Sequence, residues 1–298
     1  MTIIAYQSFN ANSSSSHGLA ATSLQRFTRD TNRRVTQEGH EALVLPTLPT
    51  EGGITAPVYG PAHLRPIETL GPLQPVNVFG AQIALLWQNF YRAFGDMPDI
   101  LVCGEIDMSH PDFTGLVIDE NVKIENFAST KACQSFTAIS QSPLGSKALM
   151  NGEGFVVYLI AGMVVVFVHV PNRIARDFDA TRSFYWDIAQ AIKSHGAIIH
   201  LVIGDTNQSS FDFTAQALNA AFETSTYKNA SDSAQVSKID NYNVVERGTN
   251  SSGNKMYDVC VFRTDLVRLK KGPVYLSQSS GAVTVTDHCG LGVQVERK

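Results

Sequence analysis

Polar residues that can carry acid/base or metal chemistry recur at one kind of place in this chain, where an apolar strand meets a turn. The run HLVIGDTNQSS at residues 200–210 gives the pattern, with an apolar stretch that stops at Gly204 and presents Asp205 and Asn207. Polar side chains placed just beyond a buried strand are held rigidly, with little side-chain entropy left to lose. Taken alone, GDTN is more typical of a plain turn in which Asp and Asn bond their own backbone.

Further positions of the same kind change that interpretation. They are Glu105 after residues 99–103, His169 after residues 164–168, Asp258 in residues 257–262, and Asp287 with His288 after residues 282–286. With Asp205 they supply two histidines and four carboxylates. Phosphate-ester hydrolysis needs such a set, because a divalent cation on carboxylates neutralises phosphate oxygens while a base activates water. Each residue alone could be structural, but one site explains all of them.

The elements that must position these residues are strands and helices in mixed order. Strands are expected at residues 2–7, 99–103, 201–203, 257–262 and 282–286, and at two core strands that meet near Gly162 within 155–170. Apolar spacing predicts helices at about 19–38, 79–94, 179–194 and 215–222. Helices separate the strands in the middle of the chain, whereas strands cluster at its end. This order predicts mixed sheets.

Length and composition favour one globular domain over residues 1–298. Hydrophobic residues make up 44% of the chain and charged residues 17%, which fits a sizeable core. Seven prolines between residues 46 and 75 predict a long irregular insertion. The formal net charge of −4 gives no global attraction to nucleic acid, so local basic groups or bound cations must handle a polyanion.

Cysteines and apolar runs restrict the class further. No CxxC pair is present among the four cysteines, so zinc is disfavoured and buried free thiols are expected. The apolar run at 155–170 is too short to span a bilayer. The N-terminus lacks a basic region followed by an apolar segment, so we expect no signal peptide. The expected location is cytoplasmic, or outside the cell by a signal-peptide-independent export route.

The order strand-Glu, strand-His, GDxN, YD-strand and DH resembles the endonuclease/exonuclease/phosphatase superfamily, which includes DNase I. The residues after His169 and after GDTN are most similar to DNase I and the cytolethal distending toxin nuclease subunit. The resemblance implies an α/β fold, a DNase I-like four-layered sandwich of two mixed β-sheets with helices outside. It also implies a hydrolase that depends on Mg²⁺, or on Mn²⁺ or Ca²⁺.

Site roles follow from the same resemblance. Glu105 and Asp287 would bind the metal, and Asp205 with Asn207 would contact the scissile phosphate. His288 would be the general base, oriented by Asp258, and His169 would be the second catalytic histidine. Further residues implied by position are Arg182, Asn172 and Arg173 for substrate phosphate and Glu153 for orienting His169.

The opening strand departs from the family pattern. Where the family carries a metal-site asparagine, this chain has Gln7, and Asn10 follows three residues later. Either amide could supply the metal ligand, on a longer side chain or in a shifted loop.

The function expected from these motifs is a Mg-dependent endonuclease that hydrolyses phosphodiester bonds of DNA, with a possible toxin or effector role. Two alternatives stay open. One is a phosphomonoesterase or phospholipid-type phosphoesterase of the same superfamily, and the other is a non-catalytic binding protein on this scaffold. The sequence identifies no protein partner.

Overall fold

The computed structural model describes residues 1–9, 89–106, 122–129, 134–141, 146–208, 212–232, 237–238, 249, 256–276, 279–280, 283–284 and 288–298. The expected helix at 19–38, the proline-rich segment at 46–75, Asn10 and Asp287 lie outside these residues. No helix in the described part of the chain is long and apolar enough to cross a bilayer.

The first sheet has seven strands in the order β10-β12-β15-β1-β2-β4-β3. Their bounds are β1 Thr2–Ser8, β2 Ile100–Gly104, β3 Val122–Phe127, β4 Phe136–Gln141, β10 Ser237–Lys238, β12 Val267–Leu276 and β15 Gly290–Arg297. β1 pairs with β2 in parallel and with β15 in antiparallel orientation, so the sheet is mixed. β1 lies near its centre, and all seven of its residues are buried.

The second sheet has six strands in the order β5-β6-β7-β8-β11-β9. Their bounds are β5 Lys147–Gly152, β6 Phe155–Ile160, β7 Met163–His169, β8 Leu201–Asp205, β9 Tyr227–Asn229 and β11 Asp258–Arg263. β7 and β8 are parallel, whereas β11 pairs with β8 in antiparallel orientation. β6 and β7 turn at Ala161 and Gly162, which confirms the prediction of two core strands in this run.

The two sheets pack face to face over one large apolar core. Alternate residues of each strand enter it, such as Ile4 and Tyr6 of β1 and Val165 and Phe167 of β7. Because side chains alternate across a strand, the residue two positions beyond each of these points to the same face. This alternation brings the strand-end polar residues to the open end of the core.

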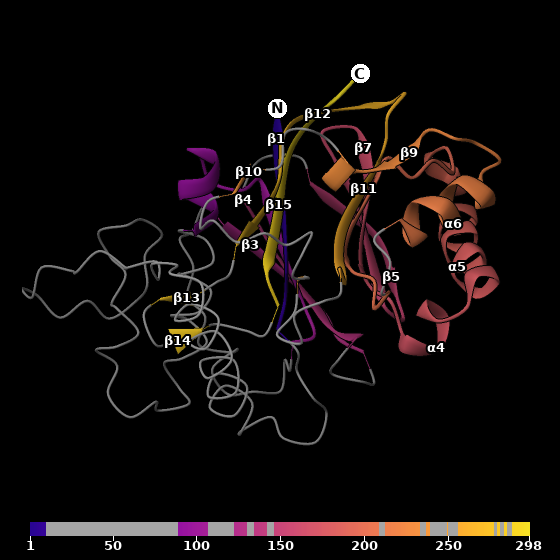
Figure 1. Ribbon diagram of the computed structural model, residues 1–298, viewed down its shortest axis with the longest axis horizontal. Helices are drawn as coiled ribbons and strands as arrows, with labels where there is room; N and C mark the ends of the chain where they lie inside the picture. Colours follow the sequence, from indigo (N-terminus) through magenta and orange to yellow (C-terminus); the bar gives the residue numbers. More distant parts are fainter. Residues whose placement is uncertain are drawn as a thin grey trace, which may run out of the picture.

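Helices cover the outer faces of both sheets, which gives four layers (Figure 1). α5 (Phe178–Ala191) and α6 (Phe213–Ala221) pack on the second sheet through a separate apolar cluster. Residues 89–94 are helical, and Phe90 and Phe94 lie against Gly292 of β15. The short helices are α4 (Asn172–Ala175), η4 (Lys193–His195) and η5 (Ala230–Asp232). The predicted four-layered α/β sandwich is confirmed.

The end of the chain differs from its prediction. Within the expected strand at 282–286 the structure describes β14 (Val283–Thr284), which pairs with β13 (Ser279–Ser280) in a separate two-stranded sheet. The sandwich instead uses β12 and β15, which the sequence did not predict. β12 carries Gly272 and Pro273 in its middle, where the register shifts against β15. Such residues normally argue against a strand, and here an irregular pairing accommodates them.

The cysteine prediction is confirmed where the structure describes it. Cys103, Cys260 and Cys289 are buried and free. Burial raises the pKa of the thiols of Cys103 and Cys260 far above its usual value, so both stay protonated. Cys133 lies outside the described residues.

Gly204 allows β7 and β8 to pair closely directly before the functional residues. Its φ is +146°, and a Cβ at this position would lie 2.1 Å from the carbonyl oxygen of Val168. No L side chain fits there, because the backbone of β7 already occupies the space. Glycine at this position therefore sets the register that places Asp205 opposite His169.

We expect Gly204→Ala to lower the free energy of unfolding by about 3 kcal/mol or more, through backbone strain and collision with Val168. Urea denaturation followed by circular dichroism measures the effect. Gly196→Ala is the matched control, since Gly196 has φ +94° but no heavy atom within 4 Å of a Cβ. The control should lose only about 1–2 kcal/mol, and equal losses in the two variants would contradict the collision.

Candidate active site

Strands of both sheets bring their polar residues to one edge of the sandwich. β1, β2, β7 and β8 end there, and β11 begins there at Asp258. Register sets His169 opposite Asp205 on one side and Asp258 opposite Asp205 on the other. His288 lies between β14 and β15, two residues before the start of β15, a strand that the sequence did not predict. The strands thus converge, with Asp205 in the middle of the site.

The first group of the site is Glu105, His169 and Asp205, all buried. His169 Nε2 lies 3.0 Å from Glu105 Oε1 and 4.0 Å from Asp205 Oδ2. Ser8, the last residue of β1, donates from its hydroxyl to Glu105 Oε2 at 2.9 Å. Glu105 comes from the first sheet and the other two from the second, so this group joins the sheets.

The second group is Asp205, Asp258 and His288, also buried. His288 Nδ1 lies 2.8 Å from Asp258 Oδ2 and 3.8 Å from Asp205 Oδ2. The ring of Tyr257 stacks on the imidazole of His288, with centroids 6.4 Å apart. An imidazole whose Nδ1 is held by a carboxylate can act as a base through its Nε2, the arrangement used by histidine bases.

Two residues of the site adopt left-handed backbone conformations. Glu105 has φ +56° and Asn207 has φ +54°, which side chains other than glycine adopt only at a cost. In the turn, the Asn207 backbone N–H donates to Asp205 Oδ1 at 2.8 Å. The Asn207 amide donates to the Val170 carbonyl at 2.9 Å and lies 3.0 Å from His169 Nε2. The GDTN turn therefore holds Asn207 against His169.

Burial dominates the electrostatics of the carboxylates. It raises the pKa of Glu105, while the nearby His169 acts in the opposite direction. It also raises the pKa of Asp258 against the opposing effect of His288. Ionised carboxylates gathered in a dry site are unfavourable unless a cation or a donor compensates them.

The donor set fits a hard divalent cation. In each of the two groups the ligand atoms lie within 4.8 Å of one another, and carboxylate oxygens predominate. Gln7 Oε1 and Asp258 Oδ1 are buried and have no hydrogen-bond partner among the described residues. Buried oxygens of this kind are suited to bind a cation or water. The identity of the ion is not determined by these distances.

The side chain of Gln7 makes backbone hydrogen bonds that its position in the sequence did not predict. Its amide donates to the backbone carbonyls of Ser8 and His288, at 3.0 and 3.1 Å. It thereby ties β1 to the backbone of the candidate base. Whether its buried Oε1 binds metal stays a prediction, and Asn10 and Asp287 lie outside the described residues.

Glu153 and α4 lie beside His169. Glu153 is in the turn between β5 and β6, and the next residue, Gly154, accepts the His169 backbone N–H at 2.9 Å. The Glu153 carboxylate pairs with Arg173 Nη2 at 2.6 Å. Asn172 and Arg173 are exposed on α4, three and four residues after His169. The orienting role of Glu153 and the phosphate-binding roles of Asn172 and Arg173 stay predictions.

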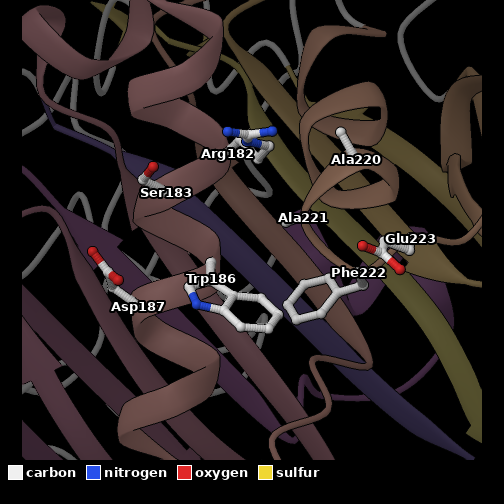
Figure 2. A pocket seen from close by; sticks show the side chains of 8 residues that line it. All are labelled: Arg182, Ser183, Trp186, Asp187, Ala220, Ala221, Phe222 and Glu223. Atoms are coloured by element: carbon white, nitrogen blue, oxygen red, sulfur yellow. The ribbon is translucent and has the colours of Figure 1, made fainter.

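Arg182 lies in a different setting. It pairs with Asp179 at 3.4 Å and lines a groove between α5 and α6, together with Trp186 and Phe222 (Figure 2). The described contacts of Arg182 belong to this helix layer and do not include the site histidines. Its predicted role at the substrate phosphate gains no support from these contacts.

Sequence reasoning missed three residues of the site. Ser8 bonds Glu105, and Thr249 accepts the Asp258 backbone N–H at 2.9 Å. Tyr6 lies beneath the carboxylates, with its hydroxyl over Gly104. Strand alternation could have found Tyr6 and Ser8, because both share the inward face of β1 with Ile4. Thr249 belongs to none of the motifs, so no pattern in the sequence indicated it.

Comparison with known proteins identifies solved structures that resemble this fold. No protein-family model matches the sequence, and no curated protein matches it significantly. The chain is similar in structure to a mannosyl-6-phosphatase from Bacteroides thetaiotaomicron, with a TM-score of 0.52, 11% identity, and 99% and 100% of the two chains covered. It is also similar to an endonuclease/exonuclease/phosphatase from Bacteroides vulgatus, with a TM-score of 0.50, 11% identity, and 100% and 99% covered.

We expect Glu105→Gln to raise the Tm of the metal-free protein by a few degrees at pH 8. The raised pKa means that ionised Glu105 disfavours the folded state above that pKa. The gain should shrink as the pH falls through the raised pKa and vanish below about 4.3, where the carboxyl is protonated in both the folded and the unfolded chain. Thermal unfolding in EDTA across this pH range measures it.

Saturating Mg²⁺ should reverse the order, because only the wild-type site gains the stability of the bound cation. Glu296→Gln is the control, since Glu296 is paired with Arg268 and Lys270 on the surface and should show no gain. A Glu105→Gln protein that is less stable than wild type in EDTA at pH 8 would contradict the electrostatic account.

Proposed function

The chain has the fold of the endonuclease/exonuclease/phosphatase superfamily, and on this fold we propose that it is a Mg-dependent endonuclease that hydrolyses phosphodiester bonds of DNA. The observation that carries the hydrolytic part is the buried Asp258–His288 pair at 2.8 Å, which faces Asp205, Glu105 and His169 across the same site. A base, a second histidine and an acidic cation site are what phosphoester hydrolysis requires.

In this proposal His288 activates the attacking water. Asp258 accepts the Nδ1 hydrogen of His288 at 2.8 Å, which leaves Nε2 unprotonated and able to take the proton from water. The buried carboxylate also stabilises the imidazolium that results. Gln7 supports the same residue from the other side, by donating to the His288 carbonyl at 3.1 Å.

The opposite side of the site stabilises the phosphate. His169 and the Asn207 amide lie 3.0 Å apart, and in this proposal their N–H groups turn from their present partners, Glu105 and the Val170 carbonyl, to a phosphate oxygen or to the leaving oxygen. Glu105 and Asp205, with Asp287 and Gln7 as further candidates, would hold the cation. When bound there, a divalent cation supplies Lewis-acid neutralisation of the phosphate charge.

A nucleic-acid substrate is favoured by the short helix that follows His169. α4 and its C-cap expose Asn172, Arg173 and Arg176 within seven residues of the histidine. Exposed arginines beside a phosphate site can contact the phosphates that flank the scissile one. The competing candidate is a phosphomonoesterase, as the name of the similar mannosyl-6-phosphatase indicates for that protein. Such an enzyme needs no flanking phosphate contacts.

We expect His288→Ala and His169→Ala each to lower the rate of plasmid nicking by about 100- to 10,000-fold, because a positioned proton-transfer group is lost. Agarose-gel nicking of supercoiled DNA in Mg²⁺ measures the rate, and EDTA should abolish it. His195→Ala is the control, since His195 is exposed on η4. Wild-type nicking by purified His288→Ala would contradict the mechanism.

Parallel assays separate the substrate classes. DNA cleavage with no release of phosphate from sugar phosphates or phosphoinositides supports the endonuclease. The reverse result supports the phosphomonoesterase or phospholipid-type alternative on the same residues. A protein that hydrolyses no phosphoester in Mg²⁺, Mn²⁺ or Ca²⁺ would instead be a binding protein on this scaffold.

A further inference from the structure

The groove between α5 and α6 exposes an aromatic surface that the candidate active site does not use. Its volume is about 590 Å³, within the range of about 300–1,000 Å³ that is usual for binding sites. Trp186 lies in this groove with 46% of its surface exposed, and its ring packs on Phe222 with the centroids 6.0 Å apart (Figure 2). Phe222 packs in turn on the buried Tyr227, with centroids 5.8 Å apart. The indole is therefore held from below, while almost half of its surface stays open to solvent.

The charges that line the groove do not cancel. Arg182 pairs with Asp179 at 3.4 Å, so a carboxylate already compensates its positive charge. Asp187 on α5 and Glu223, the residue after the C-cap of α6, are exposed on either side of the two rings. Neither of these carboxylates forms an ion pair with another described residue. The groove therefore carries a net negative charge beside an open indole.

This combination of an indole and two carboxylates selects a cation. The face of a tryptophan ring is the best aromatic partner for a guanidinium or an ammonium group. A guanidinium fits better than an ammonium, because its planar group can stack on the ring while it donates two parallel hydrogen bonds to a carboxylate. The same carboxylates repel phosphate, so the groove does not suit a nucleic-acid backbone.

We propose that the α5–α6 groove is a docking site for a partner protein, which places an arginine of a basic segment on Trp186, between Asp187 and Glu223. A protein partner is favoured over a small cation because tryptophan is the residue type that is enriched at the energetic centres of protein interfaces. Charges around such a centre set the choice of partner. The groove shares no residue with the two groups of the candidate active site, so this inference does not depend on the proposed function.

NMR spectra of the ¹⁵N-labelled full chain test the site, with a short peptide of alternating glycine and arginine as the probe. The chain has two tryptophans, Trp87 and Trp186, and the indole N–H signal of Trp186 is identified by its loss in Trp186→Phe. We expect the arginine peptide to shift this signal. The same peptide with citrulline in place of arginine should not, because citrulline keeps the shape of arginine without its charge. Glu223→Gln should raise the Kd of the arginine peptide by about 2- to 5-fold, as for an exposed ion pair.

Glu296→Gln is the matched control for charge. It removes the same charge from β15 in the first sheet, where Glu296 is paired with Arg268 and Lys270, and should bind the peptide as wild type does. Equal Kd values for Glu223→Gln and Glu296→Gln, or equal shifts of the Trp186 signal by the arginine and citrulline peptides, would overturn the inference.

Other occupants of the groove give different results. Free arginine that binds as tightly as the peptide would show a small-molecule site and overturn the docking of a protein. A Trp186 signal that responds to single-stranded oligothymidylate and not to the arginine peptide would overturn the inference in favour of a nucleic-acid surface. No hydrolysis is measured in these titrations, so their failure would leave the proposed function intact.

Discussion

The packing of two apolar sheets face to face is the constraint on which the rest of the structure depends. It requires every strand to send alternate side chains into one shared core, such as Ile203 and Cys260 of the second sheet. Where the core meets solvent, the next residue on the inward face can be polar. Asp205 and Asp258 are those residues on β8 and β11, and His169 is the equivalent on β7. The same alternation that builds the core therefore assembles the site.

This way of assembling a site has an energetic consequence. Carboxylates at the end of an apolar core are desolvated, so burial raises the pKa of Glu105 and of Asp258. The left-handed backbones of Glu105 and Asn207 add strain at the same place. The desolvation of the carboxylates and the backbone strain are both unfavourable for folding. The well-paired sheets supply the stability that offsets them. A site held in this state by its scaffold keeps its carboxylates and histidines in one fixed arrangement.

The sequence predicted the second sheet and its functional ends better than the first sheet. β7 and β8 are continuous apolar runs closed by His169 and by Gly204 with Asp205, and such runs fix both the strand and its end. β12 and β15 escaped prediction because charged residues and Gly272 interrupt β12, and because His288 precedes β15 where a strand was expected to end. Tyr6 and Ser8 were missed because alternation shows only that they share a face of β1, and the whole strand is buried, so residue type does not reveal which face packs on the second sheet.

The choice of substrate is a separate question from the arrangement of the carboxylates and histidines in the site. The ligand atoms of each group lie within 4.8 Å of one another, a span suited to a single phosphate and its cation. A phosphodiester and a phosphomonoester both present such a phosphate, so under the proposed function these residues alone do not choose between the two reactions. Discrimination must then come from groups around these residues, and one described candidate is Arg173, which is paired with Glu153. Because that pair neutralises its own charge, an extended polyanion would have to draw Arg173 away from Glu153, whereas a small phosphate ester would not. Under the proposed function, the Arg173–Glu153 pair would therefore favour a small phosphate ester unless an extended polyanion supplies a better partner for Arg173.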